Sequence, residues 1–412
     1  TLTDSLLIRY KEALNGKKAI IPEGFYPGEY LAVLGKKLAA DYGSKLLDMD
    51  EASIHQKLRK IAVSEMLELI KLDLEKLGVK HDVFTSEQSL HDTGKIDEAV
   101  ATLTKMGLIY YGTLPPPKGK IDENWQEKEQ LLLRSSNYGD DQDRPIQKSD
   151  GSWSYLAADF AYAKDKIDRG FEYLIYILGA DHSGYVKRIK AVIEALSQGK
   201  VKSDIRTSQL VNFVKGTEPI KMSKRSGNFM TVSDVINEVG KDIIRFIMLT
   251  RRNDVTLDFD FAKVKEQSKD NPVFYVQYAH VRAKSILAKA KETLPLAYEI
   301  FVNREFNLSL LNSEEEIQLI KLLASWPKIL SSSAITREPQ KIAYYLIDIA
   351  SRFHSIWNLG KENNDYRFII EDNEQVRIDI ARMVHSLKGH AARHCAIANN
   401  GNNLSVFFVA EP

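Results

Sequence analysis

An unbroken apolar run at residues 173–178, ended by Gly179, constrains the fold of this chain more than any other segment. Apolar residues that do not alternate with polar ones predict a strand buried on both faces, as in a parallel sheet covered by helices. Asp181 and His182 follow directly, and a helical pattern occupies residues 186–196. Because open α/β sheets bind ligands at the carboxyl ends of their strands, this segment predicts a ligand site.

Size and composition indicate a globular protein with more than one domain. The 412 residues exceed what one core usually supports, and 44% hydrophobic with 27% charged residues is ordinary globular composition. A single cysteine, Cys395, excludes an internal disulfide and favours a reducing compartment. The sequence has no stretch of roughly 18 to 20 apolar residues and no signal-peptide layout. We therefore expect a cytoplasmic protein without a membrane segment.

The distribution of charge is more informative than the net charge of +1. Residues 182–225 contain ten Lys or Arg against three acidic residues. Such a basic segment suits a phosphate-rich ligand, and a solvated surface would explain it as well.

Apolar periodicity predicts mixed helices and strands in the first part of the chain. A period of about 3.6 residues over residues 50–80 predicts a long helix. Short β-like runs lie at residues 81–85, 108–111 and 209–214. Together with the strand at 173–178, these runs predict an α/β core.

The chain changes to long amphipathic helices from Thr231 onward. Thr231 with Asp234, and Ser313 with Glu316, have the spacing of a capping box ahead of an apolar helical pattern. A third helix is expected from about Pro339. Three such helices after an α/β core predict a separate helical domain.

Two lysines, Lys221 and Lys224, stand three residues apart in the segment KMSKR, shortly before Gly227. On a loop of this composition they can converge on a polyphosphate and stabilise the charge that develops when pyrophosphate leaves. Taken alone, this spacing is common on protein surfaces. Its meaning depends on the residues around it.

The wider sequence resembles one enzyme family. The segment KMSKRSGNF at residues 221–229 resembles the nucleotide-binding signature of class I aminoacyl-tRNA synthetases. Residues 149–188, which include YLAAD and ILGADH, are similar to the arginine-site region of bacterial arginyl-tRNA synthetases. Residues 271–287, NPVFYVQYAHVRAKSIL, are similar to the start of that family's anticodon-binding domain. With weaker agreement, as at residues 24–31, the resemblance spans most of residues 6–370.

The resemblance implies an α/β fold class. We expect the second half of a doubly wound, Rossmann-like catalytic domain with a helical insertion, followed by an all-α anticodon-binding domain. The helical insertion and connective part is expected at residues 1–80, the nucleotide-binding domain with the loop 221–225 at 81–260, and the helical domain at 261–412.

Two features depart from the family's pattern. None of the nine histidines lies in an H-x-G-H motif, so the chain is expected to lack that motif and the family's N-terminal module. Near the other end, the helical period breaks at Gly389 and a β-like run occupies residues 406–409. A shifted reading frame and a divergent tail would both explain this end.

The resemblance also implies an ATP site. Lys221 and Lys224 would stabilise the ATP phosphates, and the backbone of Met222 and Ser223 would lie near the adenine. Gly179 and Asp181 match the G-x-D element that meets the ATP ribose. An alternative role for Asp181 is the N-cap of the following helix, and both roles are compatible.

The amino-acid substrate implied by the resemblance is arginine. Its guanidinium offers five planar donors and therefore needs a carboxylate and a second acceptor or stacking surface. Tyr155 and Asp159 are four residues apart on one expected helical face, and the matching Tyr and Asp of the family hold the arginine side chain. His182 aligns beside the bound substrates. The alternatives are a buried helix acid for Asp159 and an ordinary loop histidine for His182.

For tRNA, the expected helical domain offers Tyr275, Tyr278 and Arg282, with Trp357 and Arg367 further along. Proteins that recognise RNA loops stack bases on aromatic rings and use Arg or Lys on the backbone. Packing of the two tyrosines in the helical core is the alternative.

The implied function is arginine–tRNA ligation. L-arginine would attack the α-phosphorus of Mg²⁺-bound ATP, and the arginyl group would then pass to the terminal ribose of tRNA(Arg) without a protein nucleophile. A monomer without a structural metal is expected, because His390, His394 and Cys395 lack a fourth ligand. The alternative is a non-catalytic tRNA-binding fragment or paralogue.

Overall fold

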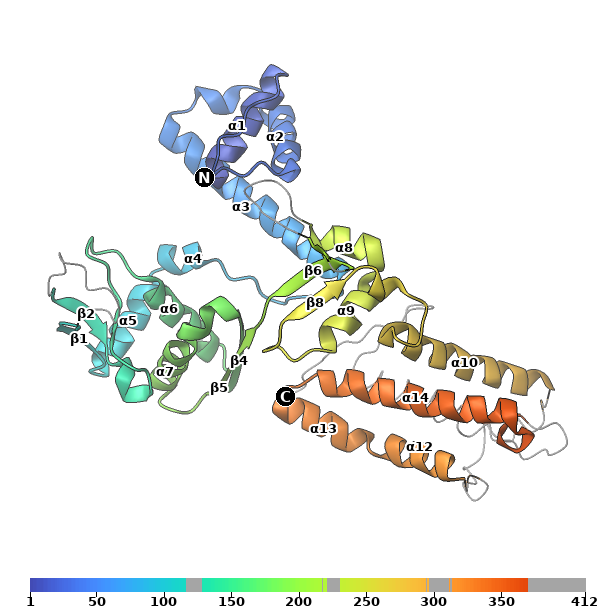
Figure 1. The fold of residues 1–412 in the computed structure, drawn as a ribbon. Helices are drawn as coiled ribbons and strands as arrows, with labels where there is room; N and C mark the ends of the chain where they lie inside the picture. Colours follow the sequence, from blue (N-terminus) through green and yellow to red (C-terminus); the bar gives the residue numbers. More distant parts are fainter. Residues whose placement is uncertain are drawn as a thin grey trace. The chain divides into compact units, whose positions relative to one another are not determined.

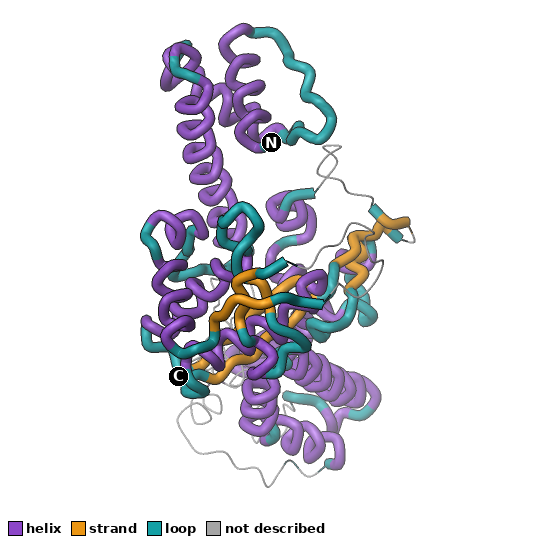
Figure 2. The backbone as a smooth tube through the Cα atoms, turned by 90° about the vertical axis from the view of Figure 1, so that its left-hand side faces the viewer, coloured by secondary structure: helices purple, strands orange, loops and turns teal. Residues whose placement is uncertain are grey.

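The computed structural model describes residues 1–115, 128–216, 218–220, 230–293, 295, 311 and 313–369. The chain divides into two compact units. The first comprises residues 1–80, 212–252 and 257 onward, and the second comprises residues 81–211 and 253–256. Helices form most of the described chain, and strands are few (Figure 2).

The first unit begins with helices α1 (Leu2–Asn15), α2 (Glu29–Tyr42), η1 (Lys45–Asp48) and α3 (Glu51–Lys76), which Figure 1 shows together. α1 and α2 approach so closely that a Cβ at Gly35 would lie 2.6 Å from the backbone of Arg9. Asp50 caps α3 by accepting a hydrogen bond from the Ser53 N–H at 2.9 Å. The long helix predicted at residues 50–80 is therefore confirmed. The helices α1, α2, η1 and α3 share a core that contains Leu6, Tyr10, Leu31, Leu34, Leu38, Leu46, Ile54, Leu58 and Ala62.

A small sheet with the order β7-β6-β8 follows in the same unit. It consists of β6 (Val211–Lys215), β7 (Glu218–Pro219) and β8 (Leu257–Asp260), and β6 pairs antiparallel with β7. β6 confirms the strand predicted at 209–214. Its core is aromatic, with the Phe213 ring 5.8 Å from that of Phe259 and 5.5 Å from that of Phe261.

The helix predicted after Thr231 is two helices rather than one. The capping box of Thr231 and Asp234 is present at the start of α8 (Val232–Val239). Gly240, at φ +83°, then turns the chain before α9 (Lys241–Leu249). Because a positive φ is easily adopted only by glycine, the helix ends here although the apolar period continues.

Four further helices complete the described part of this unit. They are α10 (Pro272–Thr293), α12 (Glu314–Ala324), α13 (Trp326–Thr336) and α14 (Gln340–Glu362), followed by the turn η6 (Asn364–Tyr366); η4 (Lys263–Lys265) precedes α10. The capping box of Ser313 and Glu316 and the helix predicted from Pro339 are both confirmed. Buried residues of α9, α10, α12, α13 and α14 form one apolar core, which includes Phe246, Val276, Leu319, Trp326 and Phe353.

The second unit combines helices with two small sheets. In chain order it contains α4 (Glu87–Asp92), α5 (Lys95–Lys105), β1 (Ile109–Gly112), β2 (Gln130–Leu133), η2 (Ser135–Tyr138), β3 (Arg144–Pro145), α6 (Tyr155–Asp168), β4 (Tyr173–Gly179), η3 (Ala180–Tyr185), α7 (Val186–Ser197) and β5 (Lys202–Ser208). β1, β2 and β3 form an antiparallel sheet. β1 confirms the strand predicted at residues 108–111, whereas residues 81–85 form no strand.

β4 and β5 are parallel, in register from Tyr173 opposite Lys202 to Gly179 opposite Ser208. The expectation that both faces of β4 are buried is wrong for the described residues. Leu174 is 4% exposed, whereas Ile175 is 51% and Ile177 is 74% exposed. Leu174, Tyr176 and Leu178 pack into the core of this unit, so its helices cover one face of β4 and the described residues leave the other apolar face open.

Candidate functional site

Helix α6 carries the two residues predicted to bind an amino-acid side chain. Its start is fixed by Ser154, whose N–H donates to the Ile146 carbonyl at 3.0 Å and whose hydroxyl donates to the Pro145 carbonyl at 3.2 Å. Tyr155, the first helical residue, is 72% exposed, and the ammonium of Lys148 lies 5.6 Å from its ring centroid. Asp159 follows one turn later on the same face and is half-buried. The predicted helical spacing of the pair is confirmed.

Asp159 lies in an unusual electrostatic environment. Burial, with a smaller contribution from the negative charge of Glu87 on α4, raises the pKa of Asp159 to about 6. The positive charges of Lys166 and His182 oppose this shift. Asp159 is therefore ionised at neutral pH although burial disfavours its charged form, which is typical of a carboxylate that binds a cationic ligand.

The carboxyl end of β4 carries Gly179, Asp181 and His182, as the sequence predicts. Asp181 and His182 lie in η3 and are exposed, with the His182 Nε2 3.6 Å from the Asp181 Oδ2. A Cβ at Gly179 would overlap the Asp181 carboxylate. Asp181 is not the N-cap of α7, because that helix begins at Val186 with Tyr185 at the capping position. Its carboxylate therefore remains accessible to solvent and ligands.

The ammonium of Lys166, on the last turns of α6, was not among the residues singled out from the sequence. Its Nζ lies 2.8 Å from the ring centroid of Tyr162 and 4.9 Å from that of Tyr176 on β4. Burial, with a smaller contribution from Arg169, lowers the pKa of Lys166 to about 7. The sequence indicates Lys166 only by its position. It comes seven residues after Asp159 and therefore lies on the same helical face.

The lysine pair of the sequence analysis lies outside the described residues, and so do Met222 and Ser223. The structure describes the strands that lead toward this segment. In the first unit, β6 and β7 pair with Val214 opposite Pro219 and Lys215 opposite Glu218. The Gly216 N–H donates to the buried Asp260 carboxylate at 3.3 Å.

A second cluster of predicted residues lies between α10 and α14 in the first unit. The Arg282 guanidinium donates to His354 Nδ1 and to the Tyr278 hydroxyl, each at 2.9 Å. It also lies 4.1 Å from the ring centroid of Tyr278 and 5.0 Å from that of Trp357. Tyr278 is 40% exposed, whereas Tyr275 is half-buried. The structure thus brings the predicted tRNA residues together on one helix and joins Trp357 to them.

His354 organises this cluster and was not singled out from the sequence. A guanidinium can only donate, so Nδ1 accepts and Nε2, which carries the proton, donates to the Tyr275 carbonyl at 3.2 Å. Burial and the positive charge of Arg282 lower the pKa of His354, while the bond to Tyr275 partly opposes them. The histidine is therefore neutral and fixed in one tautomer.

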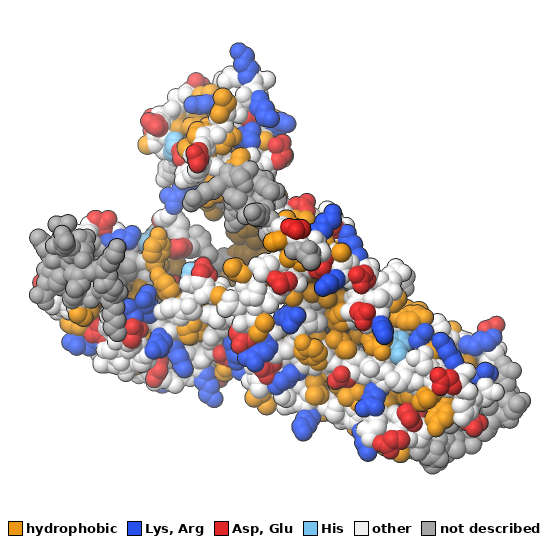
Figure 3. Space-filling model, in the orientation of Figure 1, with side chains coloured by type: hydrophobic (Ala, Val, Ile, Leu, Met, Phe, Trp, Pro, Cys, Tyr) orange, Lys and Arg blue, Asp and Glu red, His pale blue; other side chains and the backbone are white. Residues whose placement is uncertain are grey.

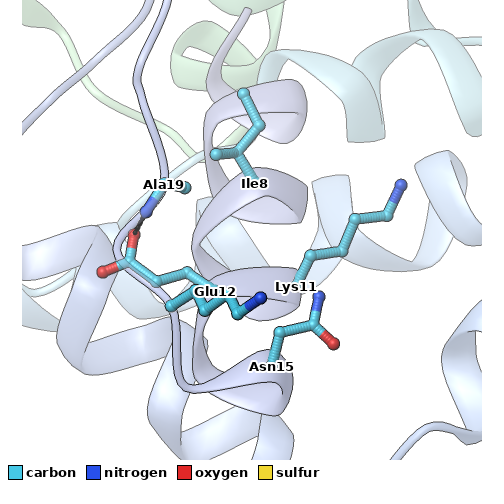
Figure 4. Close-up of a pocket in the computed structure, with 6 residues that line it drawn as sticks. Ile8, Lys11, Glu12, Asn15 and Ala19 are labelled. Carbon is cyan, nitrogen blue, oxygen red and sulfur yellow. Dashed lines mark hydrogen bonds between the residues drawn. The ribbon is translucent and has the colours of Figure 1, made fainter.

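Other surface features do not bear on these clusters. An open pocket on α1 is lined by Ile8, Lys11, Glu12, Asn15, Lys17 and Ala19 (Figure 4). It contains none of the predicted site residues. On the face drawn in Figure 3, basic and acidic side chains are interspersed. Among the described residues, no helix has both the length and the apolar character that crossing a membrane requires.

Two family models match the chain. The family described as "tRNA synthetases class I (R), catalytic domain" matches residues 36–285. The family described as "DALR anticodon binding domain" matches residues 276–388. The first match contains α6, η3 and the segment 221–225, and the second contains Tyr278, Arg282 and His354. The predicted fold class, a class I catalytic region followed by an anticodon-binding region, is confirmed.

Curated relatives and a solved structure agree with the family models. The arginine–tRNA ligase of Rickettsia prowazekii is 60% identical over 389 residues, 94% of this chain and 67% of the relative. That of Rickettsia felis is 61% identical over 377 residues, 92% of this chain and 65% of the relative. The chain thus spans about two thirds of the length of these relatives.

Among solved structures, one of an arginyl-tRNA synthetase from Campylobacter jejuni matches with a TM-score of 0.75 and 31% identity. It covers 93% of this chain and 77% of the solved one. Class I synthetases use ATP. The resemblance is therefore confirmed, and the chain belongs to the arginine–tRNA ligase family of class I tRNA synthetases.

Proposed function

We propose that this protein activates L-arginine with ATP, forming arginyl-adenylate and pyrophosphate, and transfers the arginyl group to the 3′ end of tRNA(Arg). The observation that carries the proposal is the 60% identity to an arginine–tRNA ligase over 94% of the chain. The electrostatics of Asp159 add independent support, because a half-buried carboxylate fits a guanidinium ligand.

In the proposed arginine site, Asp159 accepts a pair of hydrogen bonds from the planar guanidinium. Tyr155 offers its exposed ring as a stacking surface and its hydroxyl as an acceptor. His182, which follows Asp181 in η3, lies beside the substrates. A lysine substrate cannot make the same pair of bonds, so this site discriminates without an editing step.

In the proposed ATP site, Gly179 permits close approach of the ribose and Asp181 accepts from its hydroxyls. Lys221 and Lys224 stabilise the phosphates, with Met222 and Ser223 near the adenine. ATP enters as its Mg²⁺ complex, a substrate rather than a resident cofactor. No protein nucleophile is required, since positioning and charge stabilisation accelerate the attack of the arginine carboxylate.

For tRNA, we propose that Tyr278 and Arg282 contact the nucleotide bases and backbone and that Tyr275 supports them. The exposure of Tyr278 and the pre-positioned guanidinium of Arg282 favour this role. We further propose that the protein acts as a cytoplasmic monomer, with the catalytic domain at 81–260 between the connective part at 1–80 and the helical domain at 261–412.

Arginine-dependent exchange of pyrophosphate into ATP tests this function. The chain should catalyse exchange with arginine and not with lysine, and Lys224→Ala should slow it by about 100-fold or more, because a charge at the departing pyrophosphate is lost. Lys200→Ala, an exposed lysine outside the predicted sites, is the matched control and should not change the rate. Salt-dependent tRNA binding without any exchange would instead favour a tRNA-binding protein and contradict the proposal.

A further inference from the structure

Arg282 on α10 is a half-buried cation without an acidic partner among the described residues. Within that part of the chain, its guanidinium contacts only the neutral side chains of His354, Tyr278 and Trp357. The two hydrogen bonds use two of its five N–H groups. Because a guanidinium is always charged, the remaining donors favour an anionic ligand.

The surroundings of Arg282 favour a nucleic acid as that ligand. Besides Arg282, α10 contains three lysines and a single acidic residue, Glu292. Tyr278, one turn before Arg282, is 40% exposed and stacks on Phe274 with the ring centroids 5.5 Å apart. Single-stranded RNA offers phosphates to such a guanidinium and bases to such a ring. The helix therefore presents both contacts together.

His354 on α14 fixes the guanidinium from the interior side. Its ring centroid lies 4.6 Å from that of Tyr275 and 6.0 Å from that of Phe353. Since Nε2 donates to the Tyr275 carbonyl, the Nδ1 lone pair is directed to Arg282. Buried residues of α10 and α14 belong to one apolar core, and a packed core holds the acceptor and the guanidinium in fixed relation.

We propose that His354 is a positioning residue for RNA binding: through Nδ1 it holds the Arg282 guanidinium in the orientation in which its remaining N–H groups bind a phosphate of tRNA. The inference rests on the proposed function, because it takes tRNA as the ligand of the helical domain. A free arginine side chain loses conformational freedom when it binds, whereas one that the fold already holds loses less. His354 touches no RNA itself and acts through Arg282.

Two substitutions separate the bonds that His354 makes. In His354→Asn the amide oxygen takes the place of Nδ1 and can still accept from Arg282, whereas the bond to the Tyr275 carbonyl is lost. In His354→Gln the amide N–H takes the place of Nε2 and can still donate to Tyr275, whereas Arg282 loses its acceptor. Only the second substitution should weaken RNA binding. A histidine with a purely structural role would instead lose binding in proportion to stability in both variants.

Fluorescence anisotropy of a labelled tRNA(Arg) transcript, titrated with the full chain, measures the Kd, and urea unfolding measures the stability of each variant. His354→Gln should bind roughly fivefold more weakly than the wild type, and His354→Asn should bind within about twofold of it. Arg282→Ala should bind about tenfold more weakly or worse, and the slope of log K against log salt should fall by about one, because a phosphate contact is lost.

A double-mutant cycle tests whether His354 and Arg282 act as one unit. Adding His354→Gln to Arg282→Ala should not weaken binding further, whereas adding it to Lys284→Ala should again weaken binding roughly fivefold. Lys284 is an exposed lysine two residues further along α10, so the control removes the same charge from the same helix. Additive effects of His354→Gln and Arg282→Ala would overturn the inference.

A second measurement needs no variant of His354. ¹⁵N NMR of the wild-type imidazole at neutral pH should show an unprotonated Nδ1 and a protonated Nε2, and Arg282→Ala should shift the Nδ1 resonance. A protonated Nδ1 cannot accept from a guanidinium and would overturn the inference, as would equal tRNA affinity of the wild type and His354→Gln. Both results leave the proposed function intact. Absence of tRNA binding by the wild type would overturn the proposed role in tRNA binding, and this inference with it.

Discussion

Two groups of ionisable side chains in this molecule differ in how the fold treats their charge. Around α6, burial raises the pKa of Asp159 and lowers that of Lys166, so the fold disfavours the ionised form of each. Between α10 and α14, Arg282 and His354 are joined by a hydrogen bond of 2.9 Å, and His354 also bonds to the backbone of Tyr275. In the first group burial destabilises the ionised side chains, whereas in the second group the side chains are stabilised by hydrogen bonds within the fold.

This difference distinguishes residues that we expect to bind a ligand from residues that hold a surface in a fixed geometry. Buried ionisable groups with shifted pKa values are typical of functional sites, because a bound ligand supplies the stabilising interaction that the folded protein alone does not provide. A satisfied cluster instead stabilises the fold and presents its outer members, here Tyr278, in a fixed geometry. Substitutions in the two regions should therefore have opposite effects on stability.

The largest expected effect is on activity at the α6 group. Asp159→Asn should raise the KM for arginine in pyrophosphate exchange by about 100-fold or more, since a charged hydrogen-bonded partner worth roughly 3 kcal/mol is lost. Asp168→Asn, an exposed acid on the same helix paired with Lys164, should leave KM unchanged. Equal effects of the two variants would show that the helix, rather than the carboxylate, matters.

The next largest effect is on stability at the other cluster. His354 is 5% exposed, and His354→Ala should lower the free energy of unfolding by about 2–4 kcal/mol, because it opens a cavity and leaves the Tyr275 carbonyl without its bond. Urea unfolding measures this. Ser355→Ala, the exposed neighbour, should change stability by about 0.5 kcal/mol or less. Arginine-dependent exchange should survive in both variants.

The smallest expected effect is on stability at Asp159. Its sign tests whether the ionised carboxylate destabilises the folded protein. The folded pKa of Asp159 lies above its ordinary value of 3.8, so its contribution to stability is present below pH 4 and is lost as the pH rises through about 6. Asp159→Asn should therefore raise the free energy of unfolding at pH 7.5 by about 1–2 kcal/mol, a range reduced for partial solvent exposure. At pH 4 the difference from the wild type should vanish. A loss of stability at pH 7.5 would mean that Asp159 is satisfied within the fold, like His354.

Local chemistry made much of the fold predictable. The caps Thr231 with Asp234 and Ser313 with Glu316 involve residues three apart, so their geometry is decided by the backbone between them. The same holds for Tyr155 and Asp159, whose common face follows from helical periodicity. The break between α8 and α9 was missed, because the apolar period runs through Gly240 and a single glycine does not by itself end a helix.

The sequence by itself determined the family, the helix caps, the position of Asp181 directly after the strand β4 and the pair on α6. These are properties of residue type and short spacing. Only the tertiary structure decided that one face of β4 is open among the described residues, that Lys166 lies against Tyr176, and that His354 links α10 to α14. The last two depend on contacts between segments far apart in the chain, and burial, which sets the pKa values of Asp159 and Lys166, exists only after those segments have packed.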